Sequence, residues 1–189
     1  MQILKYFSFL IIIFLTLSCA KEKVEKSMIQ EKDLNLQVLE AYSEGMKALE
    51  SGDVLFAAKK FNEAETLFPQ SVWAPKSALM AAYAYYSQDY YGDAIAELER
   101  FIKIYPNHKN SDYVYYLLGI SFYEQIVDEK KDLKSIIDSK THFEILIKKF
   151  PNTEYSLDAE FKLDLINDTL AAKEMYLGRY YFQKKKWIA

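Results

Sequence analysis

A short phrase built around a proline occurs three times along this chain of 189 residues. The phrases read LFPQS at 67–71, IYPNH at 104–108 and KFPNT at 149–153, and each follows a run with helical periodicity. Because proline cannot continue a helix, each phrase predicts the end of a repeated unit. The prolines of the three phrases are 37 and 45 residues apart, which is the period range of helical-hairpin repeats. The sequence therefore predicts an all-α solenoid of stacked helix pairs.

The spacing of small and bulky residues fits the tetratricopeptide pattern. In that pattern small residues let the two helices of a hairpin approach each other, and a bulky residue fills the seam beside them. Counted back from the prolines, the two small positions and the bulky one are Gly45, Ala57 and Phe61 in the first unit, then Ala82, Ala94 and Leu98 in the second. The fold class predicted from these residues is a tetratricopeptide-repeat solenoid.

The third unit is longer than the first two. Gly119 and Phe143 fit the same small and bulky positions only if an insertion separates their helices. We expect this insertion at 127–138, and it can be either a plain solvated loop or a loop that binds a partner.

A helical pattern continues after the third proline, and we expect a helix break somewhere within 153–186. Gly178 and Tyr181 fit the first helix of a further unit, which would stop before its second helix. On this interpretation the repeat domain covers 34–189 and holds about four repeats, the last of them incomplete. The solenoid therefore looks truncated before its last helices.

The beginning of the chain reads as a lipoprotein signal peptide over residues 1–18. Lys5 supplies the positive region, 7–17 is almost entirely apolar, and the small residue Ser18 precedes Cys19, the only cysteine. A cysteine at this place predicts lipidation, whereas plain secretion or a buried thiol are the alternatives. Several acyl chains together give stable anchoring. The charged stretch that follows predicts a flexible tether over 19–33, and Ala20 favours sorting to the outer membrane.

Composition argues against several classes of function. One cysteine cannot form an internal disulfide or a cysteine-rich metal site. The two histidines stand alone, and the sequence has no phosphate-binding glycine loop and no catalytic motif. We therefore expect no metal, no cofactor and no enzymatic activity. The net charge of −3, with no basic field, also argues against nucleic acid as a partner.

Tyrosine is the most informative surface residue, with 16 copies in the chain. A tyrosine offers a large contact area and keeps a polar tip for water or for the backbone of a partner. In a tetratricopeptide solenoid, set positions on the first helix of each hairpin line the concave face. Here the candidate peptide-binding or partner-binding residues at those positions are Tyr42, Met46, Tyr83, Tyr86, Tyr113, Tyr116 and Tyr123. The alternative is that these rings pack between neighbouring repeats.

Two stretches carry a family resemblance. In RFIKIYPNHKNSDYVYYLLG the matching residues include Arg100, Pro106, His108, Asp112, Tyr113 and Gly119. In LAAKEMYLGRYYFQKKKWIA they include Arg179, Tyr180 and Tyr181. With the repeats and the cysteine border, the sequence resembles the BamD family, the tetratricopeptide lipoproteins of the outer-membrane β-barrel assembly (BAM) complex.

The resemblance implies a non-enzymatic scaffold that is lipid-anchored in the cell outer membrane, faces the periplasm and otherwise does not enter the membrane. It implies binding to the POTRA domains of BamA, to other lipoproteins of the complex, and to the targeting segments of unfolded outer-membrane proteins, so that their insertion is promoted. The alternative function is a periplasmic tetratricopeptide lipoprotein adaptor that recruits cell-wall enzymes.

Overall fold

The computed structural model describes residues 33–126 and 133–186, and within these residues every regular element is a helix. The signal peptide, Cys19 and the tether expected over 19–33, apart from Asp33, lie outside the described residues. The helices are α2 (Leu34–Glu50), α3 (Val54–Leu67), α4 (Trp73–Tyr86), α5 (Tyr91–Ile104), α6 (Ser111–Glu124), α7 (Leu133–Lys149) and α8 (Glu154–Gln183).

The three prolines stand where the sequence predicts, in the turns after α3, α5 and α7. Each of these helices ends two residues before its proline, at Leu67, Ile104 and Lys149. Proline lacks a backbone N–H and fixes φ, so the chain leaves the helix there and starts the next hairpin. The prediction that proline ends each repeated unit is confirmed.

Local side chains and one glycine fix other helix boundaries. Asp33 accepts a hydrogen bond from the backbone N–H of Asn35, and Asp53 accepts one from that of Phe56. These bonds satisfy N–H groups that have no partner inside their own helix. Between α2 and α3, Gly52 adopts a φ of 83°, a conformation that side chains disfavour. The turn inside the first hairpin is therefore encoded locally.

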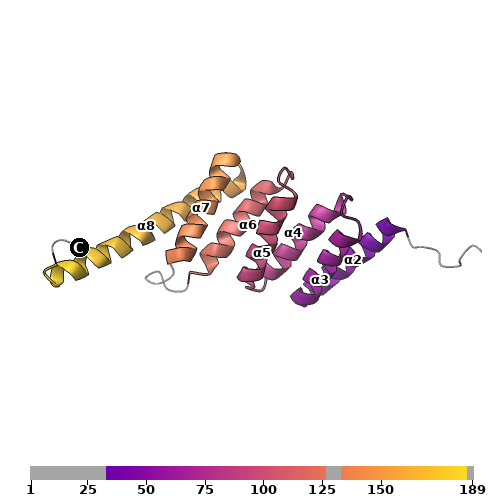
Figure 1. Cartoon of the computed structure of the whole chain (residues 1–189), viewed down its shortest axis with the longest axis horizontal. Helices are drawn as coiled ribbons and strands as arrows, with labels where there is room; N and C mark the ends of the chain where they lie inside the picture. Colours follow the sequence, from indigo (N-terminus) through magenta and orange to yellow (C-terminus); the bar gives the residue numbers. More distant parts are fainter. Residues whose placement is uncertain (1–32, 127–132, 187–189) are drawn as a thin grey trace, which may run out of the picture. The chain divides into compact units, whose positions relative to one another are not determined.

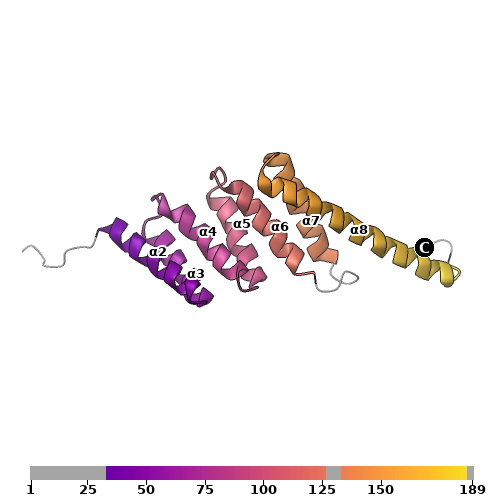
Figure 2. The same ribbon diagram turned by 180° about the vertical axis from the view of Figure 1, so that it is seen from behind.

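The helices stand side by side in chain order, as Figure 1 shows and Figure 2 repeats from behind. Each helix contacts the next one, and α2, α4, α6 and α8 also contact one another in succession. Among the described helices, the backbones of α3, α5 and α7 do not approach one another as closely. The row is therefore more closely spaced along its even-numbered helices, and we call this side the inner face.

Glycine–phenylalanine contacts confirm the predicted pairing of small and bulky positions. A Cβ built on Gly45 would lie 2.8 Å from Cε1 of Phe61, and one built on Gly119 would lie 2.6 Å from Cε1 of Phe143. Both phenylalanines are fully buried. The first and third hairpins therefore close because a ring of the second helix lies directly on a glycine of the first helix.

The largest core runs continuously from α4 to α8. Its fully buried large residues include Leu98, Phe101, Leu118, Phe143 and Leu146. Burying one such side chain contributes about 1.5–3 kcal/mol relative to exposure. Because this core crosses every repeat boundary in that part of the chain, it fixes the spacing of the inner face.

Two sequence expectations about the second half of the chain are wrong. The loop expected over 127–138 does not extend through 133–138, because α7 begins at Leu133 and Ile136 is fully buried in the core. Residues 127–132 lie outside the described residues. The helix break expected within 153–186 is also absent, since α8 is one helix of 30 residues. No proline interrupts it, and Gly178 is exposed with open space around it, so nothing ends the helix there.

None of the helices in the described residues combines the length and the apolar character needed to cross a membrane.

Candidate functional site

Five tyrosines gather on the inner face, and we call Tyr83, Tyr86, Tyr113, Tyr116 and Tyr155 the tyrosine cluster. They come from α4, α6 and α8, the helices that contact one another along this face. Residues three apart on a helix lie on the same side, which places the pairs from α4 and α6 together. The Tyr155 ring centroid lies 5.2 Å from that of Tyr113 and 5.4 Å from that of Tyr116. The cluster is therefore a continuous aromatic surface built from three repeats.

The cluster is neither core nor fully exposed. Tyr83 is 37% exposed, and the other four rings are partly buried. Burial, followed by the neighbouring hydroxyls of Tyr83, Tyr155 and Tyr86, raises the pKa of Tyr113 to about 12. The Tyr113 phenol therefore stays neutral at physiological pH and can act as a hydrogen-bond donor.

Carboxylates border the cluster. The Tyr116 hydroxyl donates to Asp158 at 2.7 Å, from α6 to α8. The Tyr91 hydroxyl donates to Asp89 at 2.7 Å, and the Tyr91 ring centroid lies 5.8 Å from that of Tyr86. Burial first, then Glu124 and Asp89, raise the pKa of Tyr86. The aromatic surface thus has an acidic edge.

The structure brings together four of the seven residues predicted to bind a partner, and it separates the other three. Tyr83, Tyr86, Tyr113 and Tyr116 are in the cluster. Tyr42 instead lies against Phe61 and Trp73, with ring centroids 5.3 and 5.0 Å away.

The other two separated residues lie on different helices, Met46 on α2 and Tyr123 on α6. Met46 packs on the core of the first repeat. Tyr123 lines a separate hollow with Ile126, Ile136 and Ile166, beneath Lys162, whose Nζ lies 5.2 Å from the ring centroid.

Sequence reasoning missed Tyr155 and Asp158. Both lie in the first turns of α8, directly after the third proline phrase. Their position is equivalent to the start of α6, where Tyr113 and Tyr116 lie, but the repeat register was not assigned beyond Pro151. Assigning α8 as the first helix of a further hairpin would have identified them.

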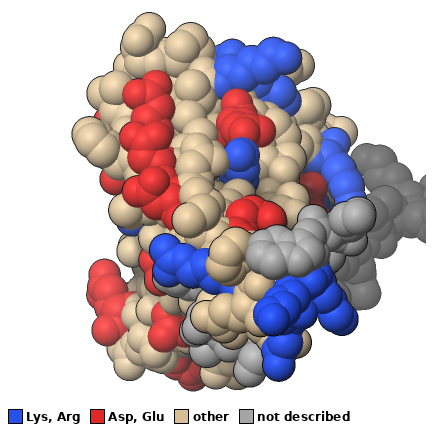
Figure 3. Space-filling model, turned by 90° about the vertical axis from the view of Figure 1, so that its left-hand side faces the viewer, with Lys and Arg blue, Asp and Glu red and all other residues tan. Residues whose placement is uncertain are grey.

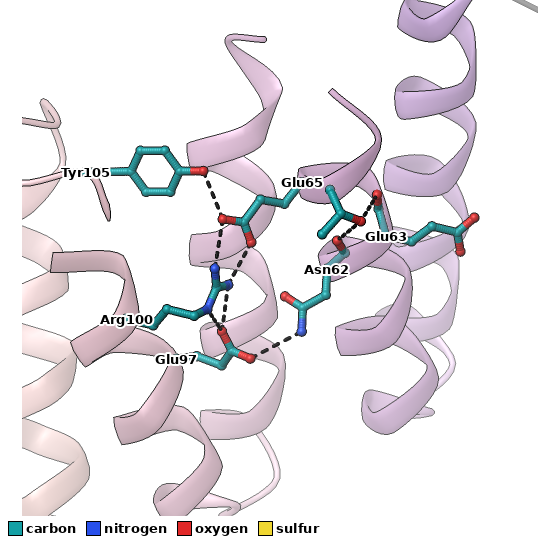
Figure 4. A network of polar contacts seen from close by, with 7 residues as sticks. Asn62, Glu63, Glu65, Glu97, Arg100 and Tyr105 are labelled. Carbon is teal, nitrogen blue, oxygen red and sulfur yellow. Dashed lines mark hydrogen bonds and ion pairs between the residues drawn. The ribbon is translucent and has the colours of Figure 1, made fainter. Parts of the chain in front are cut away.

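Arg100, the first residue of the family motif, belongs to a polar network rather than to the cluster (Figure 4). Its Nη1 and Nη2 donate to the two carboxylate oxygens of Glu65 at 2.9 and 2.7 Å. The Tyr105 hydroxyl donates to the same carboxylate at 2.9 Å, and Glu65 is only 6% exposed. A buried carboxylate is tolerated here because three donors satisfy it.

The network extends further along the same seam. Arg100 Nε donates to Glu97 at 2.8 Å, and the amide of Asn62 donates to Glu97 at 3.2 Å. The hydrogen bond to Glu65 and then the one to Glu97 raise the pKa of Arg100 despite the opposing effect of burial, so it remains charged. This network joins α3 to α5, and its role is to fix the first repeat to the second.

The remaining motif residues fall in three places. Pro106 and His108 lie in the turn before α6. There the ring centroids of His108 and Phe101 are 5.5 Å apart, and the two rings are nearly perpendicular. Asp112 accepts from the backbone N–H of Tyr113 at 2.8 Å, and Gly119 lies in the seam already described. Arg179, Tyr180 and Tyr181 lie on the exposed end of α8.

The described residues contain no group of three histidine, cysteine or carboxylate residues that could hold a metal ion. Figure 3, which looks at the α8 end of the row, shows acidic and basic side chains interspersed among uncharged ones. Stacked hairpins, glycine–phenylalanine seams and an aromatic inner face define this chain as a tetratricopeptide-type repeat protein, a class that works by presenting binding surfaces.

Comparison with known families identifies the branch of this class. The model of the YfiO family, described as "Outer membrane lipoprotein", matches residues 35–189. The chain belongs to this family of outer membrane lipoproteins.

Curated relatives carry one name. A Caulobacter vibrioides protein named "Outer membrane protein assembly factor BamD" is 35% identical over 167 residues, covering 88% of this chain and 54% of the relative. A Rickettsia prowazekii protein of the same name is 35% identical over 189 residues, covering 100% of this chain and 73% of the relative. The chain thus spans about half of the first relative and nearly three quarters of the second.

Solved structures support the fold alone. The first tetratricopeptide domain of Spaghetti (RPAP3), bound to an HSP90 peptide, superposes with a TM-score of 0.53 at 17% identity, covering 72% of this chain and 94% of that domain. The first tetratricopeptide domain of human RPAP3 gives the same TM-score at 18% identity, covering 73% of this chain and 95% of that domain.

Proposed function

We propose that this chain is a non-enzymatic scaffold for the assembly of outer-membrane proteins. The observation that carries the proposal is the similarity to assembly factors named BamD, at 35% identity along the whole chain in the Rickettsia case. The fold agrees with this role, because stacked hairpins expose several independent faces to which different partners can bind at once.

Anchoring to the outer membrane through Cys19 is part of the proposal. A diacylglycerol thioether on this thiol, with a further acyl chain on the amine after cleavage at Ser18, would hold the repeats at the periplasmic side of the membrane. The match to a family described as outer membrane lipoproteins supports this location.

Two surfaces take the partners in this proposal. The tyrosine cluster binds targeting segments of unfolded outer-membrane proteins, since its partly buried rings offer a large aromatic contact area. The exposed end of α8, with Arg179, Tyr180 and Tyr181, contacts the POTRA domains of BamA. Other lipoproteins of the complex would use the remaining faces.

Affinity purification tests the proposal. The tagged full chain, isolated in mild detergent from the cells that make it, should retain a BamA protein as its main partner. An isolated C-terminal peptide of an outer-membrane barrel protein should bind the same preparation, and the same peptide in scrambled order should bind less. Retention of a peptidoglycan hydrolase or synthase in place of BamA would favour the cell-wall adaptor and contradict assembly.

A further inference from the structure

Three carboxylates lie around the tyrosine cluster. Asp158 accepts from Tyr116, Asp89 accepts from Tyr91 beside Tyr86, and Glu124 lies at the end of α6. After burial, carboxylates contribute to the raised pKa values of Tyr86, Tyr116 and Tyr155, whereas the contributors for Tyr113 are other tyrosines. The one lysine nearby among the described ring contacts, Lys162, lies over Tyr123. A ligand that meets the rings of the cluster therefore meets carboxylates at their edge.

Tyrosine rings in this fold already hold cations. Lys149 Nζ lies 4.6 Å from the ring centroid of Tyr115 and also donates to its hydroxyl at 2.8 Å. Lys162 Nζ lies 5.2 Å from the ring centroid of Tyr123. Tyr123 is on α6, the helix that also carries Tyr116. A ring face attracts a cation within about 6 Å, and partial desolvation strengthens that attraction. In the part of the chain that the structure describes, no such lysine or arginine contact is recorded on a ring of the cluster.

We propose that the tyrosine cluster, together with Asp158 and Glu124, recognises a lysine or arginine side chain of an extended peptide segment. This inference rests on the proposed function and specifies its ligand: a targeting segment that carries a basic residue among aromatic or aliphatic ones. The apolar stem of the basic side chain would lie along the rings of Tyr86 and Tyr113, with its charged end at the carboxylates.

The hydrogen bond already present at Asp158 leaves room for such a ligand. A carboxylate accepts at about four lone-pair sites, and the Tyr116 hydroxyl occupies one of them. That bond also holds the carboxylate at the edge of the rings, so the cation would meet a prearranged acceptor. An acidic peptide would be repelled by the same groups, and a neutral one would gain only the aromatic contacts.

The decisive measurement compares two peptides that differ in one charge. Both are acetylated and amidated heptapeptides with phenylalanine at the second and sixth positions and serine elsewhere. The central residue is lysine in one and norleucine, which has a similar stem without the charge, in the other. Isothermal titration of the full chain in detergent should show at least about fivefold tighter binding of the lysine peptide than of the norleucine peptide. Added salt should reduce this difference in affinity.

A matched pair of variants tests the role of the carboxylate. Asp158→Asn keeps the shape of the side chain and its ability to accept from Tyr116, and it should abolish most of the preference for lysine. Asp168→Asn removes the same charge from an exposed place on the same helix and should leave the preference intact. Tyr116→Phe retains the ring and leaves Asp158 unchanged, so it should also preserve the preference for the lysine peptide. Circular dichroism melting shows whether each variant is folded.

The outcomes separate this inference from the proposed function. Equal affinity of the two peptides for the unmodified chain overturns the cation site while peptide binding by the scaffold stands. Binding of neither peptide overturns both. A lysine preference that survives Asp158→Asn but disappears in Asp168→Asn overturns the assignment of the carboxylate.

Discussion

At the scale of single residues, the fold depends on the absence of a side chain at two positions. Gly45 and Gly119 each lie under a fully buried phenylalanine of the same hairpin. A glycine inside a helix costs roughly 0.5–1 kcal/mol relative to alanine, so it persists only where it gains something else. Here the gain is the close packing of two helices with a ring between them.

Gly119→Ala should therefore destabilise the protein, although alanine is the better helix former. The new methyl group would lie 2.6 Å from Cε1 of Phe143, and displacing that buried ring costs typically about 1–3 kcal/mol. Urea denaturation measures the loss. Gly178→Ala is the matched control, because nothing lies within 4 Å of its Cβ position, and it should be neutral or stabilising. A neutral Gly119→Ala would show that the seam is looser than the structure indicates.

Arg100→Met should also be costly, because it leaves Glu65 buried without its two strongest donors. Removing one member of a buried ion pair costs about 3–5 kcal/mol, and we expect the lower end because the Arg100 side chain is 36% exposed. Lys134→Ala, which removes a pair whose lysine is 88% exposed, should leave the free energy of unfolding almost unchanged. Equal losses in the two variants would contradict a structural role for the network.

Stability should fall at alkaline pH. Burial and neighbouring hydroxyls raise the pKa of Tyr113 to about 12 from an ordinary value of 10.0. A raised folded-state pKa means that the stabilisation is complete below pH 10 and is lost as pH rises toward 12, because the unfolded chain ionises first. Denaturant melts from pH 9 to 12 should show the decline, and Tyr113→Phe should make it shallower. An unchanged slope in that variant would indicate that Tyr113 is solvated.

At the scale of elements, packing against neighbouring helices determines where α7 begins and how long α8 is. α7 begins at Leu133 because Ile136 enters the core, which outweighs the charged residues around it. α8 runs for 30 residues, and its first half packs against α6 and α7, burying Ser156, Ala159 and Ile166. An element's length is thus set by what it packs on as well as by its local signals.

The tyrosines of α2 and α4 should respond differently to truncation. Tyr42→Ala removes a ring that lies between Phe61 and Trp73 and should cost about 3 kcal/mol of stability. Tyr83→Ala removes a ring that is 37% exposed and should cost far less stability. If Tyr83 is an anchor, peptide binding should weaken by about 1 kcal/mol or more. Thermal melting paired with peptide titration separates the two effects, and a large melting loss for Tyr83→Ala would assign it to packing.

At the scale of the whole molecule, the stacked hairpins position the helices of the inner face relative to one another. The proposed lipid anchor would hold this face near the outer membrane. Each repeat contacts its neighbours along the row. The stability of the row and the spacing of its helices therefore depend on the interfaces between neighbouring repeats. A scaffold of this kind needs an anchor in order to meet substrates near the membrane.

Cys19→Ser should leave the repeats folded but without their lipid anchor. Serine cannot form the thioether, so the variant should accumulate as an unlipidated precursor. Metabolic labelling with a palmitate analogue and fractionation of the cells measure the change. Ser18→Ala, which keeps a small residue before the cysteine, is the control and should be labelled normally. Normal labelling of Cys19→Ser would rule out the proposed anchor.

The sequence by itself determined the class of fold and the ends of the hairpins. Proline is disfavoured in the interior of a helix, and glycine permits two helices to approach closely, so both signals are local. The same periodicity named four of the five tyrosines in the cluster, because residues three apart share one side of a helix. Their role in binding remains a prediction.

Only the tertiary structure decided which side chains meet across repeats. Tyr42 and Tyr83 both occupy positions assigned to the concave face. Trp73 lies against Tyr42, whereas Tyr83 remains exposed. Glu65 reads as a surface residue and is buried because Arg100, 35 residues later, reaches its carboxylate. Tyr155 and Asp158 join the cluster because α8 contacts α6. Such pairings depend on the angle between neighbouring hairpins, which is set by the packing of whole helices and is not encoded in the spacing of any one motif.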